Sequence, residues 1–244
     1  MDVTELLARR TDLSTFLVHL TRRGTDGRLP GRNLKSILRQ RVIEARSAFG
    51  PAATKLRGAD LDSQKCVSFS ETPLEHIYCL TRAIPKRRFR LSSYGLAFMK
   101  MTSRKRGVNP VWYVDITPGH DWLMKPINKL VDFAVEHRKK FRDSSIAQIS
   151  PFIEEMGSGV SRTGYGYRKE FWWEREWRHK GHLHFAYSEV AFGLAPKTRI
   201  EEFEDFTQKL GRRIPFIDPQ WSVEEVIAHL CRCSGAVTPF GDSF

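Results

Sequence analysis

Cysteine and long apolar runs are both scarce in this sequence. Four cysteines among 244 residues are too few for a disulfide framework, and a reducing compartment would keep them as thiols. The longest apolar stretches fall far short of the roughly 20 residues that a membrane helix needs. The first ten residues, MDVTELLARR, contain no apolar signal region. These absences argue against a secreted or membrane protein, and we expect a cytoplasmic one.

Acidic residues are outnumbered by basic ones. Forty Lys and Arg stand against 28 Asp and Glu, which gives a formal net charge of +12. A field of this sign attracts polyanions, so nucleic acid is the first candidate partner, although such a charge can also serve only to keep a protein in solution. The length is enough to bury a real core. We predict a single domain over residues 1–244, with a core at about 15–194 and a C-terminal helical extension at 195–244.

Strand and helix patterns are irregularly interleaved, without an internal repeat or a low-complexity segment. The predicted strands are 15–21, 66–70, 94–100, 110–114, 171–178, 182–187, 189–194 and 214–217. The predicted helices are 1–13, 33–45 with Asn33 as its N-cap, 72–81, 122–141, 198–210 and a last one capped by Ser222 and ending near Cys231. Residues 157–168 are rich in Gly, Ser and Tyr, which predicts a mobile loop. This order predicts an α+β fold rather than a doubly wound parallel sheet.

The segment Trp172-Trp173-Glu174-Arg175-Glu176-Trp177-Arg178 holds the most informative pattern. On a strand, Glu174 and Glu176 share one face at about 7 Å, where two like charges raise the pKa of at least one carboxyl group. Such a pair suits acid–base chemistry. A bare pair of this kind is usually a solvated strand face. The surrounding tryptophans and the preceding loop favour an enclosed pocket under a flap instead.

Polar residues on two earlier strands complete an ordered series. His19 lies in the apolar run Leu17 to Thr21, where a core histidine with a satisfied hydrogen bond is the ordinary alternative. Ser68 and Ser70 alternate to one face at the end of a strand, where hydroxyl groups can brace a ligand or a carboxylate. A strand with a polar residue, a strand with S-x-S and a late strand with E-x-E therefore follow one another.

This series resembles the ADP-ribosyltransferase superfamily, and more narrowly the DarT-like and AbiGi-like proteins of toxin–antitoxin and phage-defence loci. The likeness spans about residues 15–190, and its motifs are 17–21, 33–38, 67–74, 94–98 and 174–178. The resemblance implies a split β-sandwich of two small mixed sheets flanked by helices, with NAD bound in a cleft between the sheets as a substrate. It leaves the acceptor open between DNA, RNA and protein.

The resemblance also implies roles for single residues. Glu176 would bond the nicotinamide ribose and stabilise the oxocarbenium-like charge, and Glu174 would act on the acceptor as a general base. The residues implied at the NAD site are His19, Thr21, Ser68, Ser70, and Tyr94 or Phe69 as the aromatic residue that stacks on nicotinamide.

Basic segments interleaved with aromatic residues are the candidate nucleic-acid surface, although each one alone reads equally well as a solvated turn or helix end. The residues in question are Arg87, Arg88, Arg90, Arg104, Lys105, Arg106, Lys139 and Lys140.

The histidines and the C-x-C pair are the candidate metal ligands. His182 and His184 share a strand face, and His179 is close by, but no carboxylate or cysteine at a standard spacing completes a set. Cys231 and Cys233 have no second pair, and we predict that both are small buried residues. No metal is expected.

Three classes of function follow from these patterns. The first is an NAD-dependent ADP-ribosyltransferase toxin that modifies nucleic acid in phage defence or a toxin–antitoxin system. An antitoxin or a chaperone is a candidate partner of such a toxin, and an NAD glycohydrolase is a related alternative. The second is a noncatalytic nucleic-acid-binding antitoxin or regulator of the AbiGi type. The third is a metal-dependent nuclease that uses Glu174, Glu176 and the nearby histidines.

Overall fold

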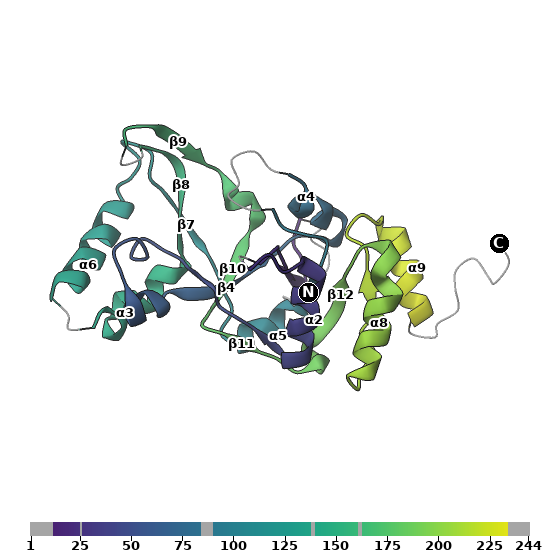
Figure 1. The fold of residues 1–244 in the computed structure, drawn as a ribbon. Coiled ribbons are helices and arrows are strands. Elements are labelled where there is room, and N and C mark those ends of the chain that lie inside the picture. Colours follow the sequence, from purple (N-terminus) through teal and green to yellow (C-terminus); the bar gives the residue numbers. More distant parts are fainter. Residues whose placement is uncertain (1–11, 25, 84–89, 138–139, 161–162, 234–244) are drawn as a thin grey trace, which may run out of the picture. The chain divides into compact units, whose positions relative to one another are not determined.

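The described residues form two compact units, each assembled from separated parts of the chain (Figure 1). The structure is a computed structural model, and it describes residues 12–24, 26–83, 90–137, 140–160 and 163–233. Unit 1 takes its residues from 1–42, 71–103 and 184–244, and unit 2 from 43–70 and 104–183. Helix α5 (Lys100–Lys105) and the short strands β2 (Val42–Ile43) and β11 (Leu183–His184) span the points where the chain passes from one unit to the other.

Unit 1 is built on a sheet in which β12 lies between β5 and β13, and β5 lies between β12 and β1. All its strand pairs are antiparallel except the parallel pair of β12 and β13. The strands are β1 (Phe16–Leu20), β5 (Gly95–Met99), β12 (Val190–Leu194) and β13 (Phe216–Ile217). The helices are α2 (Pro30–Gln40), α4 (Ile77–Thr81), α8 (Ile200–Lys209) and α9 (Val223–Cys233), with 3-10 turns η1 (Leu74–His76), η5 (Tyr187–Glu189) and η6 (Lys197–Arg199).

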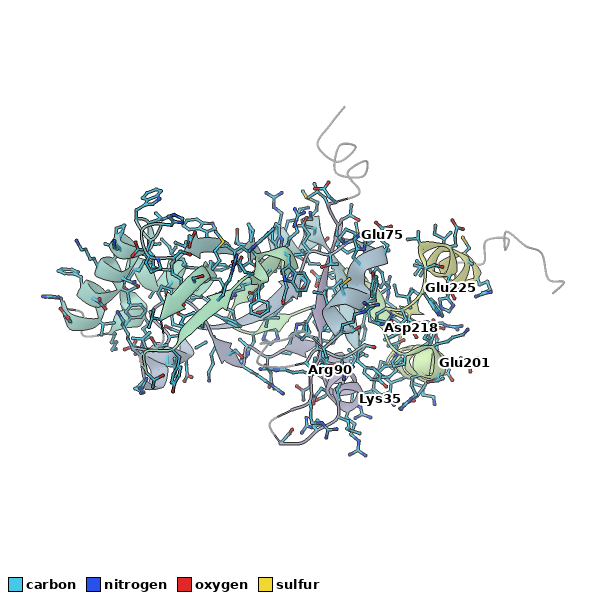
Figure 2. The ribbon with its side chains drawn as sticks, turned by 90° about the horizontal axis from the view of Figure 1, so that it is seen from above. Lys35, Glu75, Arg90, Glu201, Asp218 and Glu225 are labelled. Carbon is cyan, nitrogen blue, oxygen red and sulfur yellow. The ribbon has the colours of Figure 1, made fainter. Side chains whose placement is uncertain are left out.

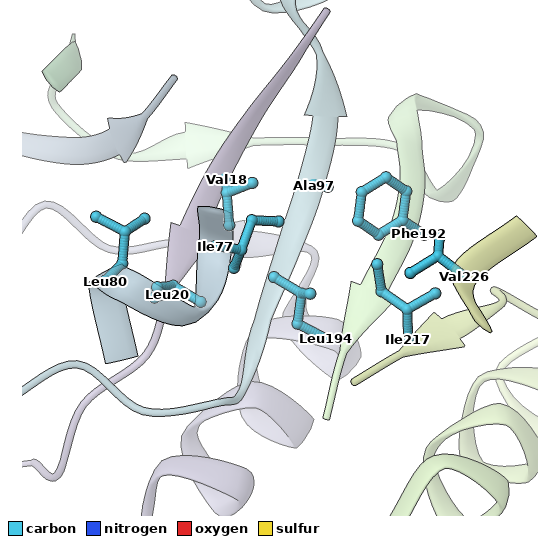
Figure 3. Close-up of a cluster of buried hydrophobic side chains, with 9 residues drawn as sticks. All are labelled: Val18, Leu20, Ile77, Leu80, Ala97, Phe192, Leu194, Ile217 and Val226. Atoms are coloured by element: carbon cyan, nitrogen blue, oxygen red, sulfur yellow. The ribbon is translucent and has the colours of Figure 1, made fainter. Parts of the chain in front are cut away.

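The core of unit 1 joins the sheet to α4 and α9 (Figure 3). Alternate residues of each strand point into it, as the period of two requires. On the other face of β12, Gly193 lies against the Phe216 ring, and a Cβ there would be 2.1 Å from it. The core residues are Val18, Leu20, Ile77, Leu80, Ala97, Phe192, Leu194, Ile217 and Val226.

Helix α2 shows why one predicted boundary is wrong. Pro30 occupies the first turn, where its missing N–H costs no hydrogen bond, and Leu34 and Leu38 are fully buried one turn apart. Asn33, predicted as the N-cap, lies inside the helix, and its Nδ2 donates to the carbonyl oxygen of Arg22 at 2.8 Å. The helix ends at Gln40 rather than near residue 45, because Arg41 adopts the left-handed conformation that often follows a helix.

Unit 2 contains two further groups of strands. In one, β10 lies between β4 and β6, and β3 pairs with β4; in the other, β8 pairs in parallel with β7 and in antiparallel with β9. The strands are β3 (Ser47–Ala48), β4 (Lys65–Ser70), β6 (Asn109–Pro110), β7 (Trp112–Asp115), β8 (Ile153–Val160), β9 (Gly166–Lys169) and β10 (Glu176–Lys180). The helices are α3 (Gly58–Asp62), α6 (Met124–His137) and α7 (Ser145–Ile149), with 3-10 turns η2 (Phe141–Asp143), η3 (Ser150–Phe152) and η4 (Phe171–Glu174).

Two predictions fail in unit 2. The single strand predicted over 110–114 is divided at Val111, since β6 pairs with β10 whereas β7 pairs with β8. The loop predicted over 157–168 is largely the antiparallel hairpin of β8 and β9, in which Gly157 lies opposite Lys169. Glycine content misled the second prediction, because Gly157 and Gly159 are needed where a Cβ would meet the side chains of neighbouring strands.

The mixture of helices with several small sheets confirms the α+β class, and the split β-sandwich stays a prediction. The strands at 15–21, 66–70, 94–100 and 189–194 and the helices at 72–81, 122–141 and 198–210 are confirmed within a few residues. Most of the predicted helix 1–13 lies outside the described residues. In the described part of the chain, none of the helices combines the length and the apolar character that a membrane span requires.

Candidate functional site

The two glutamates of the predicted catalytic pair do not lie on one strand. Glu174 is the last residue of the 3-10 turn η4, Arg175 has a φ of 46°, and β10 begins only at Glu176. The backbone N–H of Arg175 donates to the carbonyl oxygen of Trp172 at 3.1 Å and closes the turn. The alternation predicted for residues 172–178 is therefore wrong, and the two carboxylates do not share a strand face.

Glu176 is engaged by a buried arginine two residues further along β10. Arg178 donates from Nε to Glu176 Oε1 at 3.0 Å and from one terminal nitrogen to Oε2 at 2.8 Å, a bidentate pair. The same nitrogen donates to Glu154 at 2.7 Å, and the other donates to the carbonyl oxygen of Pro151 at 2.7 Å. The guanidinium also lies 3.9 Å from the centre of the Phe49 ring.

The side chain of Arg178 is almost completely buried. Burial alone would lower its pKa, but the charges and hydrogen bonds of Glu176 and Glu154 outweigh burial and raise it. A buried cation with two carboxylates and a carbonyl group as partners is a satisfied structural network. Glu176 is part of this network, so its removal would change the fold of unit 2 as well as any chemistry.

The serines predicted to accompany Glu176 lie on the strand next to it. Strand β4 pairs with β10 so that Ser70 is opposite Glu176 and Ser68 is opposite Arg178. Directly opposed residues point to the same face of a sheet. The structure therefore brings the S-x-S strand and Glu176 together. Phe69 points to the other face and is only 1% exposed, so its ring belongs to the interior.

The other residues predicted at the NAD site belong to unit 1. His19 lies on β1 opposite Leu96, and its exposure is intermediate. Thr21 is buried, with its hydroxyl 3.2 Å from the carbonyl oxygen of Pro30 and 3.0 Å from that of Tyr94. The Tyr94 ring packs on Phe203 of α8 with centroids 5.6 Å apart. Thr21 and Tyr94 thus have packing roles that the sequence pattern did not reveal.

The predicted nucleic-acid residues are spread over both units. Arg90 is exposed in unit 1, and Lys140 is exposed in unit 2. Arg104, Lys105 and Arg106 are exposed at and beyond the end of α5. Arg87, Arg88 and Lys139 lie outside the described residues.

A cavity of about 450 Å³ lies in unit 1, and its lining includes Arg90, which Figure 2 labels. Two arginines and three hydroxyl groups reach it, which is a suitable lining for an anion. Hydrogen bonds hold the wall: the Ser92 hydroxyl donates to the Thr21 carbonyl oxygen at 2.8 Å, and the Arg23 guanidinium donates to that of Gly27 at 3.4 Å. The lining residues are Arg23, Pro30, Thr81, Arg90, Leu91, Ser92 and Ser93.

His179 on β10 and His182 just beyond it contact the backbone of unit 2. His182 accepts at Nδ1 from the backbone N–H of Ala45 at 2.9 Å, and Nδ1 of His179 lies 3.2 Å from the carbonyl oxygen of Gly181. In the part of the chain that is described, the only group of three or more potential metal ligands is instead Glu204, His229 and Cys233 in unit 1. Sequence reasoning missed it because it ended the last helix near Cys231 and did not consider Glu204.

Cysteine burial also differs from the prediction. Cys233 is exposed and Cys231 is only partly buried, and α9 continues through both residues. Cys66 on β4 is the buried one, and burial raises the pKa of its thiol to about 11.

Comparison with models of known protein families gives a match. The model of the AbiGi family matches residues 35–213, well over half of the chain. The family is described as an abortive phage resistance protein and as an antitoxin. This range includes Glu176, Arg178 and Glu204. Neither a curated protein nor a solved structure matches the chain.

Proposed function

Because the chain belongs to the AbiGi family, we propose that it is the antitoxin of a phage-resistance toxin–antitoxin pair and that it acts by binding rather than by catalysis. The family match carries this proposal. The site geometry supports it, since the predicted pair of carboxylates is divided by a turn and Glu176 is held by Arg178. A toxin protein is the partner that this function requires.

Growth experiments separate this proposal from a catalytic toxin. Expressed alone in a bacterium, the chain is expected to leave growth unchanged, and co-expressed with the toxin of its own locus it is expected to restore growth. Arrest of growth by the chain alone would contradict the proposal.

An NAD-dependent ADP-ribosyltransferase is the second candidate, favoured by the pairing that places Ser70 opposite Glu176. Its test is incubation of the protein with labelled NAD and DNA or RNA. Label on nucleic acid would support a transferase, and consumption of NAD without label would support a glycohydrolase.

Glu176→Gln alone cannot assign a catalytic role, because it also removes a partner of buried Arg178. Glu154→Gln is a matched control, since Glu154 bonds the same nitrogen of Arg178 at 2.7 Å. A folding defect affects both variants, whereas loss of chemistry affects only Glu176→Gln. If both variants keep full effect on growth or NAD, Glu176 is not catalytic.

We also propose that the antitoxin binds nucleic acid through the cavity of Arg23 and Arg90. Two guanidinium groups beside serine and threonine hydroxyls match the chemistry of a phosphate group. The formal net charge of +12 supplies attraction over a longer range.

Binding of labelled oligonucleotides at several salt concentrations tests this surface. The double variant Arg23→Gln/Arg90→Gln is expected to weaken binding and to reduce the salt dependence by about one phosphate contact for each arginine. Its control is Arg46→Gln/Arg168→Gln, which removes the same charge from two unit 2 arginines that pair with Glu44 and Glu170. An equal loss in both double variants would show that only net charge matters.

A further inference from the structure

The cluster of Glu204, His229 and Cys233 lies where α8 and α9 run beside each other in unit 1 (Figures 1 and 2). Glu204 is on α8, and His229 and Cys233 are four residues apart on α9. A spacing of four places both side chains on the same face of a helix. Three potential ligands of different chemistry therefore point toward one another from two helices.

The separations of the three ligand atoms fit one metal ion. His229 Nε2 is 3.2 Å from Glu204 Oε1 and 3.4 Å from Cys233 Sγ, and Sγ is 3.8 Å from the same carboxylate oxygen. In a tetrahedral zinc site with bonds of about 2.0 Å to nitrogen and oxygen and about 2.3 Å to sulfur, ligand atoms lie about 3.3–3.6 Å apart. Shifts of a few tenths of an ångström in these three ligand atoms would give the separations of a tetrahedral zinc site.

Glu204 is already fixed as a ligand needs to be. It is 2% exposed, its Oε2 accepts from the Arg213 guanidinium at 2.7 Å, and its Oε1 accepts from the backbone N–H of Phe216 at 3.1 Å. Burial alone would raise the pKa of this carboxyl group, but the hydrogen bonds from Arg213, Phe216 and His229 outweigh burial and lower it. Oε1 faces His229 and Cys233, whereas Oε2 neutralises the arginine.

A Cys–His–Glu catalytic triad does not fit the same atoms. In a triad the acid bonds one ring nitrogen and the nucleophile the other, but here Glu204 and Cys233 both approach Nε2 of His229. Burial and the charge of Glu204 raise the pKa of the Cys233 thiol, whereas a nucleophilic cysteine needs it lowered. Convergence of all three groups on one point is what a metal ion requires.

We propose that Glu204, His229 and Cys233 bind a divalent transition-metal ion of the zinc class. Imidazole, thiolate and carboxylate are all zinc ligands, and the exposed side of Cys233 leaves the fourth position to water. Binding releases the thiol proton of Cys233 and requires an unprotonated Nε2 on His229, so affinity rises with pH. The ion would fasten α9 to α8, and this role is independent of the antitoxin proposal.

Cobalt(II) titration of the full chain, freed of metal with a chelator, tests the site. One equivalent is expected to bind, with the visible bands of tetrahedral cobalt and a sulfur-to-cobalt charge-transfer band. Cobalt should also quench the fluorescence of Trp221, whose ring is 5.1 Å from that of His229. Zinc is expected to displace the cobalt and abolish these bands.

Two cysteine variants assign the ligand. Cys233→Ser is expected to remove the charge-transfer band and to weaken binding about tenfold or more, and His229→Gln to weaken binding similarly. Cys231→Ser is the matched control, because Cys231 is two residues away on the same helix and outside the cluster. Absence of the cobalt bands in the wild-type protein would overturn the proposal, as would their loss in Cys231→Ser with retention in Cys233→Ser.

Discussion

A buried charge with several partners lies in each unit, and these two charges differ in kind. In unit 2 the charge is the guanidinium of Arg178, and its partners are two carboxylates, a carbonyl group and an aromatic ring. In unit 1 it is the carboxylate of Glu204, whose partners are a guanidinium, a backbone N–H, an imidazole and a thiol. The first charge is permanent, and the second can gain a proton.

Because of this difference, the network of Arg178 can serve only structure, whereas the cluster of Glu204 can exchange its partners. Arginine does not lose its proton in proteins, so the network of Arg178 has one state and serves packing. Glu204, His229 and Cys233 can each change protonation, and an ion can replace their shared protons. The network of Arg178, to which the predicted catalytic Glu176 belongs, is therefore less able to change its protonation or its partners than the cluster of Glu204.

The largest effect is expected from Arg178→Leu. The substitution leaves Glu176 and Glu154 without their buried cation, and breaking such a pair costs about 3–5 kcal/mol of unfolding free energy. Urea unfolding measures the loss, and hydrogen exchange should locate it in unit 2. A loss below about 1 kcal/mol would mean that the network is not structural, and the contrast between the units would fail.

A smaller and pH-dependent effect is expected from Glu204→Gln. The amide replaces a charged acceptor, which costs about 1.5–3 kcal/mol in metal-free protein near neutral pH. The pKa of Glu204 is lowered from 4.5 on folding, so its stabilisation is complete above this value and is lost as the pH falls through the lower folded-state pKa. Urea unfolding at several pH values should show the gap between wild type and variant narrowing below pH 4.5. A constant gap would show that charge is not the cause.

Thr21→Val shows how much unfolding free energy a neutral hydroxyl group contributes, for comparison with the two charged networks. Thr21 is 4% exposed, and its hydroxyl joins the end of β1 to the carbonyl oxygens of Pro30 and Tyr94. The loss of a neutral hydrogen bond with burial of its acceptors is expected to cost about 1–2 kcal/mol, measured by urea unfolding. Thr21→Ser keeps the hydroxyl and is expected to lose less. If Thr21→Val is instead as stable as wild type while Thr21→Ser is not, packing of the methyl group rather than the hydrogen bond holds this corner.

Sequence patterns predicted the parts of the fold in which local and tertiary requirements agree. Residues 16–20 and 95–99 are apolar except for His19, and they form the paired strands β1 and β5 of unit 1. The cap of the last helix was also predicted correctly, because Ser222 and Glu225 exchange hydrogen bonds as a capping box. Such signals depend only on residues near one another in the chain.

The centre of each network could not be predicted in the same way. In the sequence, nothing distinguishes Arg178 from the other cations of this basic chain. It is buried because β10 pairs with β4 and because Glu154 lies beside it. Glu204 is one of several acids on α8, and only the packing of α9 distinguishes it from Glu201 and Glu202. Contacts between segments distant in the chain bury both residues, and such contacts cannot be predicted from a single sequence.

The smallest effect is expected at Arg175, where the predicted strand breaks. Its φ of 46° places it in the left-handed region, which costs a residue with a Cβ about 1–2 kcal/mol and glycine almost nothing. Arg175→Gly should therefore leave stability within about 1 kcal/mol of wild type, since relief of strain offsets the greater freedom of the unfolded chain. Arg175→Val should lower it, because a β-branched residue fits this conformation poorly. Urea unfolding compares the two. If valine were the more stable variant, residues 174–176 would prefer the continuous strand, and Glu174 and Glu176 would then share a face after all.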